Sequence, residues 1–206
     1  MTPDEFNKVA AQVQLEIFNS YFDELNQLLR VPQADFNYAD RVELLDEKMN
    51  IFKTEATLSI NGSIFNMPSN LRALGSVVFL NNEIQRLQKN EFYNINKSKL
   101  TKPSEDYPVY LYENNSMKVY PSTITSVSIN FIRQIVDPKW NFIALPENNY
   151  RYEYDSENSV PFELHVSEQT NIITKILIYS GIIIQNPQII QIAAQQAQAE
   201  QINSKS

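Results

Sequence analysis

Residues 109–120 read VYLYENNSMKVY, and this stretch decides the fold class. Two runs rich in β-branched and aromatic residues, 109–112 and 117–120, flank the polar sequence ENNS. Such runs favour strands, and a short polar segment between them favours a tight turn. The stretch predicts a β-hairpin, so we expect the middle of the chain to be β-rich.

The neighbouring sequence adds further strands. Residues 76–87 predict another hairpin with its turn at Asn81-Asn82, because asparagine tolerates a left-handed backbone. Alternating side chains predict a strand over 127–133 and a strand from residue 57 that is interrupted near Asn61-Gly62. Tyrosines alternate with charged residues over 150–154, which predicts a peripheral strand or an extended loop.

The two ends of the chain carry helical patterns. The sequence TPDE at residues 2–5 combines a capping threonine, a proline suited to the first helical position and a glutamate three residues after the cap. It predicts a helix that ends at Pro32 and is about 40 Å long. Apolar spacing predicts further helices at 40–52, 89–95, 167–181 with its stop at Gly181, and from Asn186-Pro187 onward.

Together these elements predict an α+β protein. Its central antiparallel sheet has four to six strands, a long helix precedes the sheet and two helices follow it. We divide the chain into an N-terminal helical arm (1–56), a β-rich core (57–160) and C-terminal helices with a docking tail (161–206).

The first predicted helix has two apolar stripes. One runs from Phe6 to Leu28 with a period near 3.6, and a second widens the apolar surface. Two stripes need two neighbours, which are either parts of the same chain or another protomer. The last predicted helix carries alanines and isoleucines that permit close approach to another helix. The candidate interface residues are Leu15, Phe18, Phe22, Leu29, Ile189, Ala193 and Ala197.

Composition excludes several classes of function. The 206 residues include no cysteine, so we expect no disulfide framework, thiolate metal site or cysteine nucleophile. The net charge is −7, which argues against electrostatic binding to nucleic acid or to an acidic membrane. The 23 Asn and 15 Gln supply much of the polar surface. We see no signal peptide and no membrane span, and we expect a soluble protein made in a cytosol.

Catalytic motifs are missing from the sequence. The single histidine, His165, has no cysteine or second histidine to share a metal, and we expect it to bond a backbone group just before a helix. The three glycines are isolated, which excludes a phosphate-binding loop. Adjacent carboxylates are typical of solvated surface. We therefore predict no enzyme, no cofactor and no metal site.

Several stretches spread over most of the chain have a characteristic order and spacing: 3–7, 12–16, 21–26, 100–104, 107–110, 119–121, 132–133, 137–140, 162–165 and 172–181. In this order they resemble the head-to-tail adaptor or tail-ring virion proteins of crAss-like and related phages of gut Bacteroidetes. None of the stretches is a chemical motif, so the resemblance rests on order and spacing alone.

The resemblance implies a ring subunit, commonly in twelve copies, at the neck or tail of a virion assembled in the host cytoplasm. The implied partners are further copies, the portal protein and adjacent tail or ring proteins. DNA would pass through without sequence-specific binding, and an acidic lining would let it slide. Two alternatives stay open: a monomeric module that binds carbohydrate or a host protein through the tyrosine strand, and an acidic hydrolase using Glu153 or Asp155.

Overall fold

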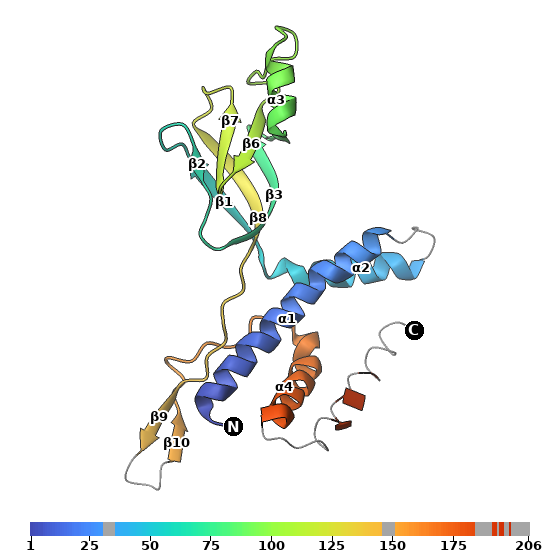
Figure 1. Cartoon of the computed structure of the whole chain (residues 1–206), viewed down its shortest axis with the longest axis vertical. Helices are drawn as coiled ribbons and strands as arrows, with labels where there is room; N and C mark the ends of the chain where they lie inside the picture. Colours follow the sequence, from blue (N-terminus) through green and yellow to red (C-terminus); the bar gives the residue numbers. More distant parts are fainter. Residues whose placement is uncertain (31–35, 146–150, 184–190, 193, 196–197, 199–206) are drawn as a thin grey trace. The chain divides into compact units, whose positions relative to one another are not determined.

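The computed structural model describes residues 1–30, 36–145, 151–183, 191–192, 194–195 and 198. The candidate interface residues Ile189, Ala193 and Ala197 lie outside these residues. The chain divides into two compact units, which can be followed in Figure 1. Met1–Ile51 and Ile135–Ser206 form a helical unit, and Phe52–Gln134 form a β unit.

These units differ from the segments expected from the sequence, because both ends of the chain belong to one unit and residues 135–160 join them. A side-chain contact shows why spacing along the sequence cannot reveal this division. The Tyr179 hydroxyl donates a hydrogen bond of 3.4 Å to Glu16 Oε2, which lies 163 positions earlier. Such a pairing carries no local signature in the sequence.

The first two helices of the helical unit are α1 (Pro3–Arg30) and α2 (Phe36–Asn50). Reciprocal capping bonds begin α1: the Thr2 N–H donates to Glu5 Oε2 at 2.7 Å, and the Glu5 N–H donates to Thr2 Oγ1 at 3.3 Å. Both the predicted cap and the predicted length are confirmed. The second helix begins at Phe36 rather than near residue 40.

The rest of the helical unit comprises β9 (Phe142–Leu145), β10 (Arg151–Tyr154), the 3₁₀ turn η1 (Val166–Glu168) and α4 (Gln169–Ile183). Strand β10 pairs with β9 as an antiparallel hairpin, which confirms the peripheral strand. The predicted stop at Gly181 is wrong, because α4 continues to Ile183 and Gly181 is buried.

The β unit holds nine elements. They are β1 (Lys53–Ser59), β2 (Phe65–Asn66), β3 (Leu71–Phe79), β4 (Asn82–Glu83), β5 (Gln85–Arg86), α3 (Lys89–Asn96), β6 (Val109–Glu113), β7 (Ser116–Tyr120) and β8 (Ser126–Arg133). The strands form two four-stranded sheets, ordered β1-β8-β3-β4 and β2-β7-β6-β5. All pairs are antiparallel except β5 with β6. The α+β class is confirmed, with the strands divided between two sheets instead of gathered in one.

The core of the β unit draws on both sheets. The buried side chains are Leu58, Phe65, Met67, Val77, Ile84, Tyr110, Met117, Val119, Ile124, Val127, Ile129 and Phe131. A second cluster of Leu87, Phe92, Val109 and Leu111 fixes α3 against β6. Because each sheet buries one apolar face against the other, the unit has a core of its own.

The sequence predicted the position of one hairpin turn of the β unit correctly and the position of the other with an error of one residue. The predicted turn of the β6–β7 hairpin is confirmed, and its two asparagines, Asn114 and Asn115, have φ of 49° and 54°. The β3–β4 turn lies one residue earlier than predicted. Leu80 and Asn81 occupy it, with φ of 45° and 65°, instead of Asn81 and Asn82.

A substitution at Gly75 is expected to destabilise the β unit. A Cβ atom built on Gly75 of β3 would lie 2.8 Å from the backbone oxygen of Asn130 in β8. Since a backbone oxygen cannot move aside without disturbing the sheet, Gly75→Ala should cost about 2 kcal/mol of unfolding free energy. Urea unfolding followed by far-ultraviolet circular dichroism measures this loss.

Gly62→Ala is the control for this prediction. The site has a φ of +67° but no atom within 4 Å of the added carbon. It should therefore cost only about 1 kcal/mol, from backbone strain alone. A Gly75→Ala protein as stable as the unaltered chain would contradict the close approach of β3 and β8.

Candidate interaction surface

The single histidine, His165, binds a backbone N–H group. His165 caps η1, where its Nδ1 accepts a hydrogen bond of 3.3 Å from the Ser167 N–H and lies 2.9 Å from Ser167 Oγ. Its Nε2 is 4.0 Å from Glu47 Oε1. The structural role predicted for His165, a bond to a backbone group just before a helix, is confirmed.

Asp155 organises a loop. Its carboxylate accepts hydrogen bonds from the side-chain amides of Asn158 at 2.8 Å and Asn141 at 2.7 Å, and from the Glu157 N–H at 3.1 Å. These bonds, Asn158 first, hold the pKa of Asp155 below its ordinary value. A carboxylate fixed and ionised in this way suits a loop anchor and not a general acid.

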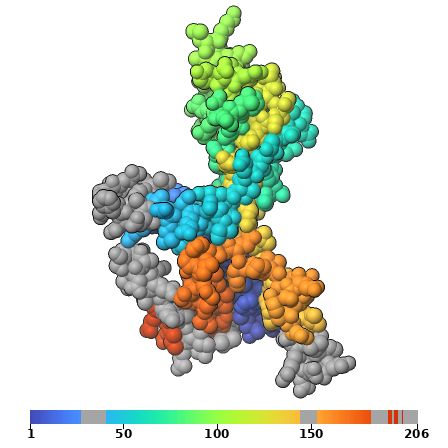
Figure 2. Space-filling view, turned by 180° about the vertical axis from the view of Figure 1, so that it is seen from behind, coloured from blue at the N-terminus to red at the C-terminus, as the bar shows by residue number. Residues whose placement is uncertain are grey.

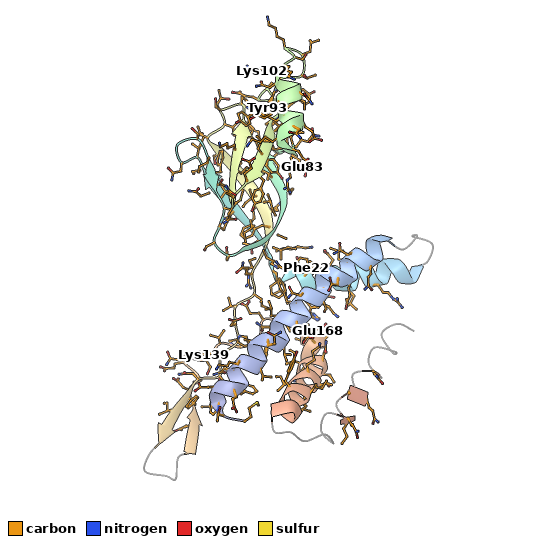
Figure 3. All side chains as sticks on the ribbon, in the orientation of Figure 1. Phe22, Glu83, Tyr93, Lys102, Lys139 and Glu168 are labelled. Carbon is orange, nitrogen blue, oxygen red and sulfur yellow. The ribbon has the colours of Figure 1, made fainter. Side chains whose placement is uncertain are left out.

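An ion pair is buried among the helices. Lys48 Nζ of α2 lies 2.7 Å from Glu168 Oε1 of η1, and both side chains are largely covered. The Asn171 amide donates to the other carboxylate oxygen at 3.0 Å. Burial disfavours the charge of Glu168, but the bonds from Lys48 and Asn171 outweigh burial and lower its pKa. Figure 3 labels Glu168 at the start of α4.

Tyr21 of α1 completes this cluster. Its ring lies 5.8 Å from Lys48 Nζ, and its buried hydroxyl has no partner in hydrogen-bond geometry among the described residues. Burial first, and the negative charge of Glu168 second, raise the pKa of Tyr21. The cluster joins α1, α2 and η1 through an ion pair and a ring contact. We assign it to stability.

Two amides on α1 hold extended backbone. The Asn7 amide donates to the Trp140 oxygen at 3.0 Å, and Asn7 Oδ1 accepts from the Trp140 N–H at 2.7 Å. Gln14 is fully buried; it donates to the Val136 oxygen at 2.7 Å and accepts from the Glu163 N–H at 2.9 Å. The expectation that amides act at the surface therefore fails here. Asn7 and Gln14 are seven residues apart on α1, and this helical spacing was the signal in the sequence that could have revealed them as a pair.

The candidate interface residues of α1 do not form one exposed stripe. Phe18 is buried and packs edge to face against half-buried Phe22, with ring centroids 5.3 Å apart. Phe18 therefore belongs to the packing of its own chain. Leu15 is 43% exposed and lines a shallow hollow with Glu16, Asp23 and Lys175. Leu29 lies within α1, and its side chain is not described.

Among the described residues, helix α4 presents an exposed apolar face. Its sequence, QTNIITKILIYSGII, is apolar on every side, a pattern typical of helices that are buried all round. Ile173 and Leu177, one turn apart, are nevertheless 52% and 44% exposed. Figure 2 shows the atoms of α4, in orange, at the molecular surface. The all-round pattern was a sequence signal for this face, and our candidate residues did not include it.

An aromatic hollow of about 520 Å³ lies beside the start of α1. It is lined by Met1, Thr2, Pro3, Phe6 and Trp140, and Trp140 meets Phe6 edge to face at 6.2 Å. The lining is mainly apolar, whereas a sugar site needs several polar groups for its hydroxyls. Of the predicted tyrosine strand, Tyr154 is exposed, and the side chains of Tyr150 and Tyr152 are not described.

Charge is divided unequally between the two units. The helical unit holds 8 basic and 18 acidic residues, a net charge of −10. The β unit holds 9 basic and 6 acidic residues, a net charge of +3. The net negative charge of the whole chain therefore comes from the helical unit alone.

Within the ranges given above, no group of three or more His, Cys, Asp or Glu side chains is placed to hold a metal ion. No helix in the described part of the chain has the length and apolarity needed to cross a bilayer. The chain matches no family model, and no curated protein matches it.

Proposed function

We propose that this chain is a non-enzymatic ring subunit of a phage neck or tail, a head-to-tail adaptor or tail-ring protein that forms part of the DNA conduit. The observation that carries the proposal is the apolar face of α4. Exposing two large aliphatic side chains on a helix that is apolar all round costs free energy, and a neighbouring protomer or virion protein would recover it.

The division of charge supports a place for the helical unit near the DNA path. In a ring, identical copies repeat the same charge around the axis, so a net charge of −10 on each helical unit becomes a continuous negative field. A negative lining repels the phosphate backbone and lets DNA slide. The resemblance of the sequence to adaptor and tail-ring proteins agrees with this arrangement.

Removing the apolar face of α4 is expected to prevent incorporation into particles. Ile173→Ser with Leu177→Ser should leave the fold intact, because both side chains already face solvent in part. Losing their burial against a neighbour costs about 2 kcal/mol per subunit, so incorporation should fall at least about tenfold. Quantitative proteomics of purified particles, normalised to the portal protein, measures this change.

Val166→Ser is the matched control. Val166 is an exposed apolar residue of η1, just before α4. Its replacement should leave incorporation unchanged. Absence of the unaltered protein from intact particles would overturn the proposed function, and full incorporation of the double variant would overturn the role of α4.

A further inference from the structure

The loop between α3 and β6 exposes apolar and basic side chains together. We call residues 97–102 the tip. Leu100 of the tip is 97% exposed and lies among Lys97, Lys99 and Lys102. The exposed acids of the same loop, Glu105 and Asp106, lie beyond the tip, next to Tyr107, which is 81% exposed. In the described part of the chain, none of these lysines has a carboxylate at ion-pair distance. Figure 3 labels Lys102 on the loop that follows α3.

The tip is an ordered loop. The Lys102 N–H donates to the Ser98 oxygen at 3.1 Å, and the Thr101 hydroxyl donates to the Ile95 oxygen at 2.9 Å. The Tyr107 N–H donates to the Ser104 oxygen at 3.2 Å. These bonds fix the loop while its largest apolar side chains remain in water. A preformed loop loses little conformational entropy when it binds, which favours a docking role.

Helix α2 offers a complementary surface. Its face beside the buried Leu45 and Met49 exposes Leu44, at 47%, together with Glu43 and Glu47. Leu44, flanked by two acids on α2, matches Leu100, flanked by three lysines on the tip. Opposite charges around a small apolar centre give an interface both attraction and register.

We propose that the tip of one copy docks on the exposed face of α2 in the next copy. This inference rests on the proposed assembly of copies and names the contact that joins them. Tip and α2 face are different surfaces, so the contact is heterologous, and each copy carries both halves. A heterologous contact forms a ring when the rotation from one copy to the next closes after a full turn, and the proposed ring subunit requires such a contact. The net charges of the two units, +3 and −10, favour the same pairing.

Because the chain has no cysteine, engineered cysteines can test this contact between copies. A Leu100→Cys chain is mixed with a tagged Leu44→Cys chain and oxidised, and the mixed disulfide is followed by mass. Docking should make the mixed adduct form about tenfold faster than collisions do. The collision rate is measured with Leu80→Cys, since Leu80 is an exposed turn leucine of the same β unit, at 79% exposure.

Charge reversal tests the complementarity. Adding Lys97→Glu, Lys99→Glu and Lys102→Glu to the Leu100→Cys chain should slow formation of the mixed disulfide to the rate of the Leu80→Cys control. When the Leu44→Cys chain also carries Glu43→Lys and Glu47→Lys, the two reversed chains should again form the mixed disulfide at the faster rate. Raising the salt from about 0.05 M to about 0.5 M should slow the unaltered pair, because salt screens exposed charges.

The proposal is overturned if the Leu100–Leu44 adduct forms no faster than the Leu80 control, or if reversal of the tip leaves it unchanged. Duplex DNA is the competing partner for a lysine-rich loop. DNA binding that disappears on tip reversal, without any preferred adduct, would also overturn it. The assay uses purified protein only. A preferred adduct from a protein absent from particles would therefore refute the proposed function and leave this contact standing.

Discussion

Replacing Lys48 with methionine is expected to destabilise the helical unit by about 3 kcal/mol, because it leaves Glu168 buried without its cation. The pair is 2.7 Å apart, and the Glu168 side chain is only 8% exposed. Urea unfolding followed by the fluorescence of Trp140 measures the loss. Trp140 is the single tryptophan of the chain and lies in the helical unit, so it reports on the unit that holds the pair.

Two further variants separate the buried charge from general damage. Lys175→Met removes an ion pair of 3.3 Å with Glu16 that is more exposed, and should cost less than about 1 kcal/mol. Replacing Lys48 and Glu168 together with methionine should recover most of the loss, since no unpaired charge is then buried. Equal losses for Lys48→Met and Lys175→Met would refute the argument.

The effect of Lys48→Met should depend on pH in a defined direction. The folded-state pKa of Glu168 lies below 4.5, so its ion pair stabilises the fold above that pH and is lost as pH falls through the folded pKa. Without Lys48, burial would raise the pKa of Glu168. Protonation of Glu168 would then remove the buried, unpaired charge and stabilise the variant. The stability difference should therefore be largest above the raised pKa that Glu168 has in the variant, and it should shrink as pH falls through that pKa towards the lowered pKa of the unaltered protein.

Local chemistry made some elements predictable. The threonine–glutamate pair at residues 2–5 forms the capping bonds that its spacing indicates, and the asparagines of the β6–β7 hairpin take the left-handed backbone that their side chains tolerate. In each case, the residues that decide the structure are next to one another in the chain. Such signals are complete within a few residues.

The backbone preferences of single residues did not predict the position of the β3–β4 turn, which is set by packing in the core. Leucine rarely takes a positive φ, yet Leu80 does so in the β3–β4 turn. The buried Ile84 explains this turn: its N–H donates to the Val77 oxygen at 2.7 Å, and its side chain enters the core. Moving the turn by one residue would turn such side chains to the other face of the sheet. The core therefore outweighs the preference of the turn.

The candidate surface was only partly predictable for the same reason. Residues Leu15, Phe18 and Phe22 share a helical spacing, but spacing does not say which of them another segment covers. The structure covers Phe18 and leaves Leu15 half exposed. The apolar sequence of α4 did not show which of its sides is free, and in the structure it is the side of Ile173 and Leu177.

The role of the Gln14 side-chain amide was not predicted from the sequence. Replacing Gln14 should lower the free energy of unfolding nearly as much as replacing Lys48. Gln14→Leu keeps the size of the side chain but leaves the Val136 oxygen and the Glu163 N–H without their partner. Each unpaired group costs about 1–3 kcal/mol, so the helical unit should lose about 3 kcal/mol in all. Trp140 fluorescence in urea reports this loss, because Trp140 lies on the extended segment that Asn7 and Gln14 hold.

Gln12→Leu makes the same chemical change at an exposed position of α1 and should alter stability by less than about 0.5 kcal/mol. The slope of free energy against urea should stay the same for both variants, because neither changes the surface exposed on unfolding. Equal stabilities for the two variants would show that α1 holds the extended segment by apolar packing alone. A loss confined to Gln14→Leu would show that a buried side-chain amide takes the place of a strand partner for residues 136 and 163.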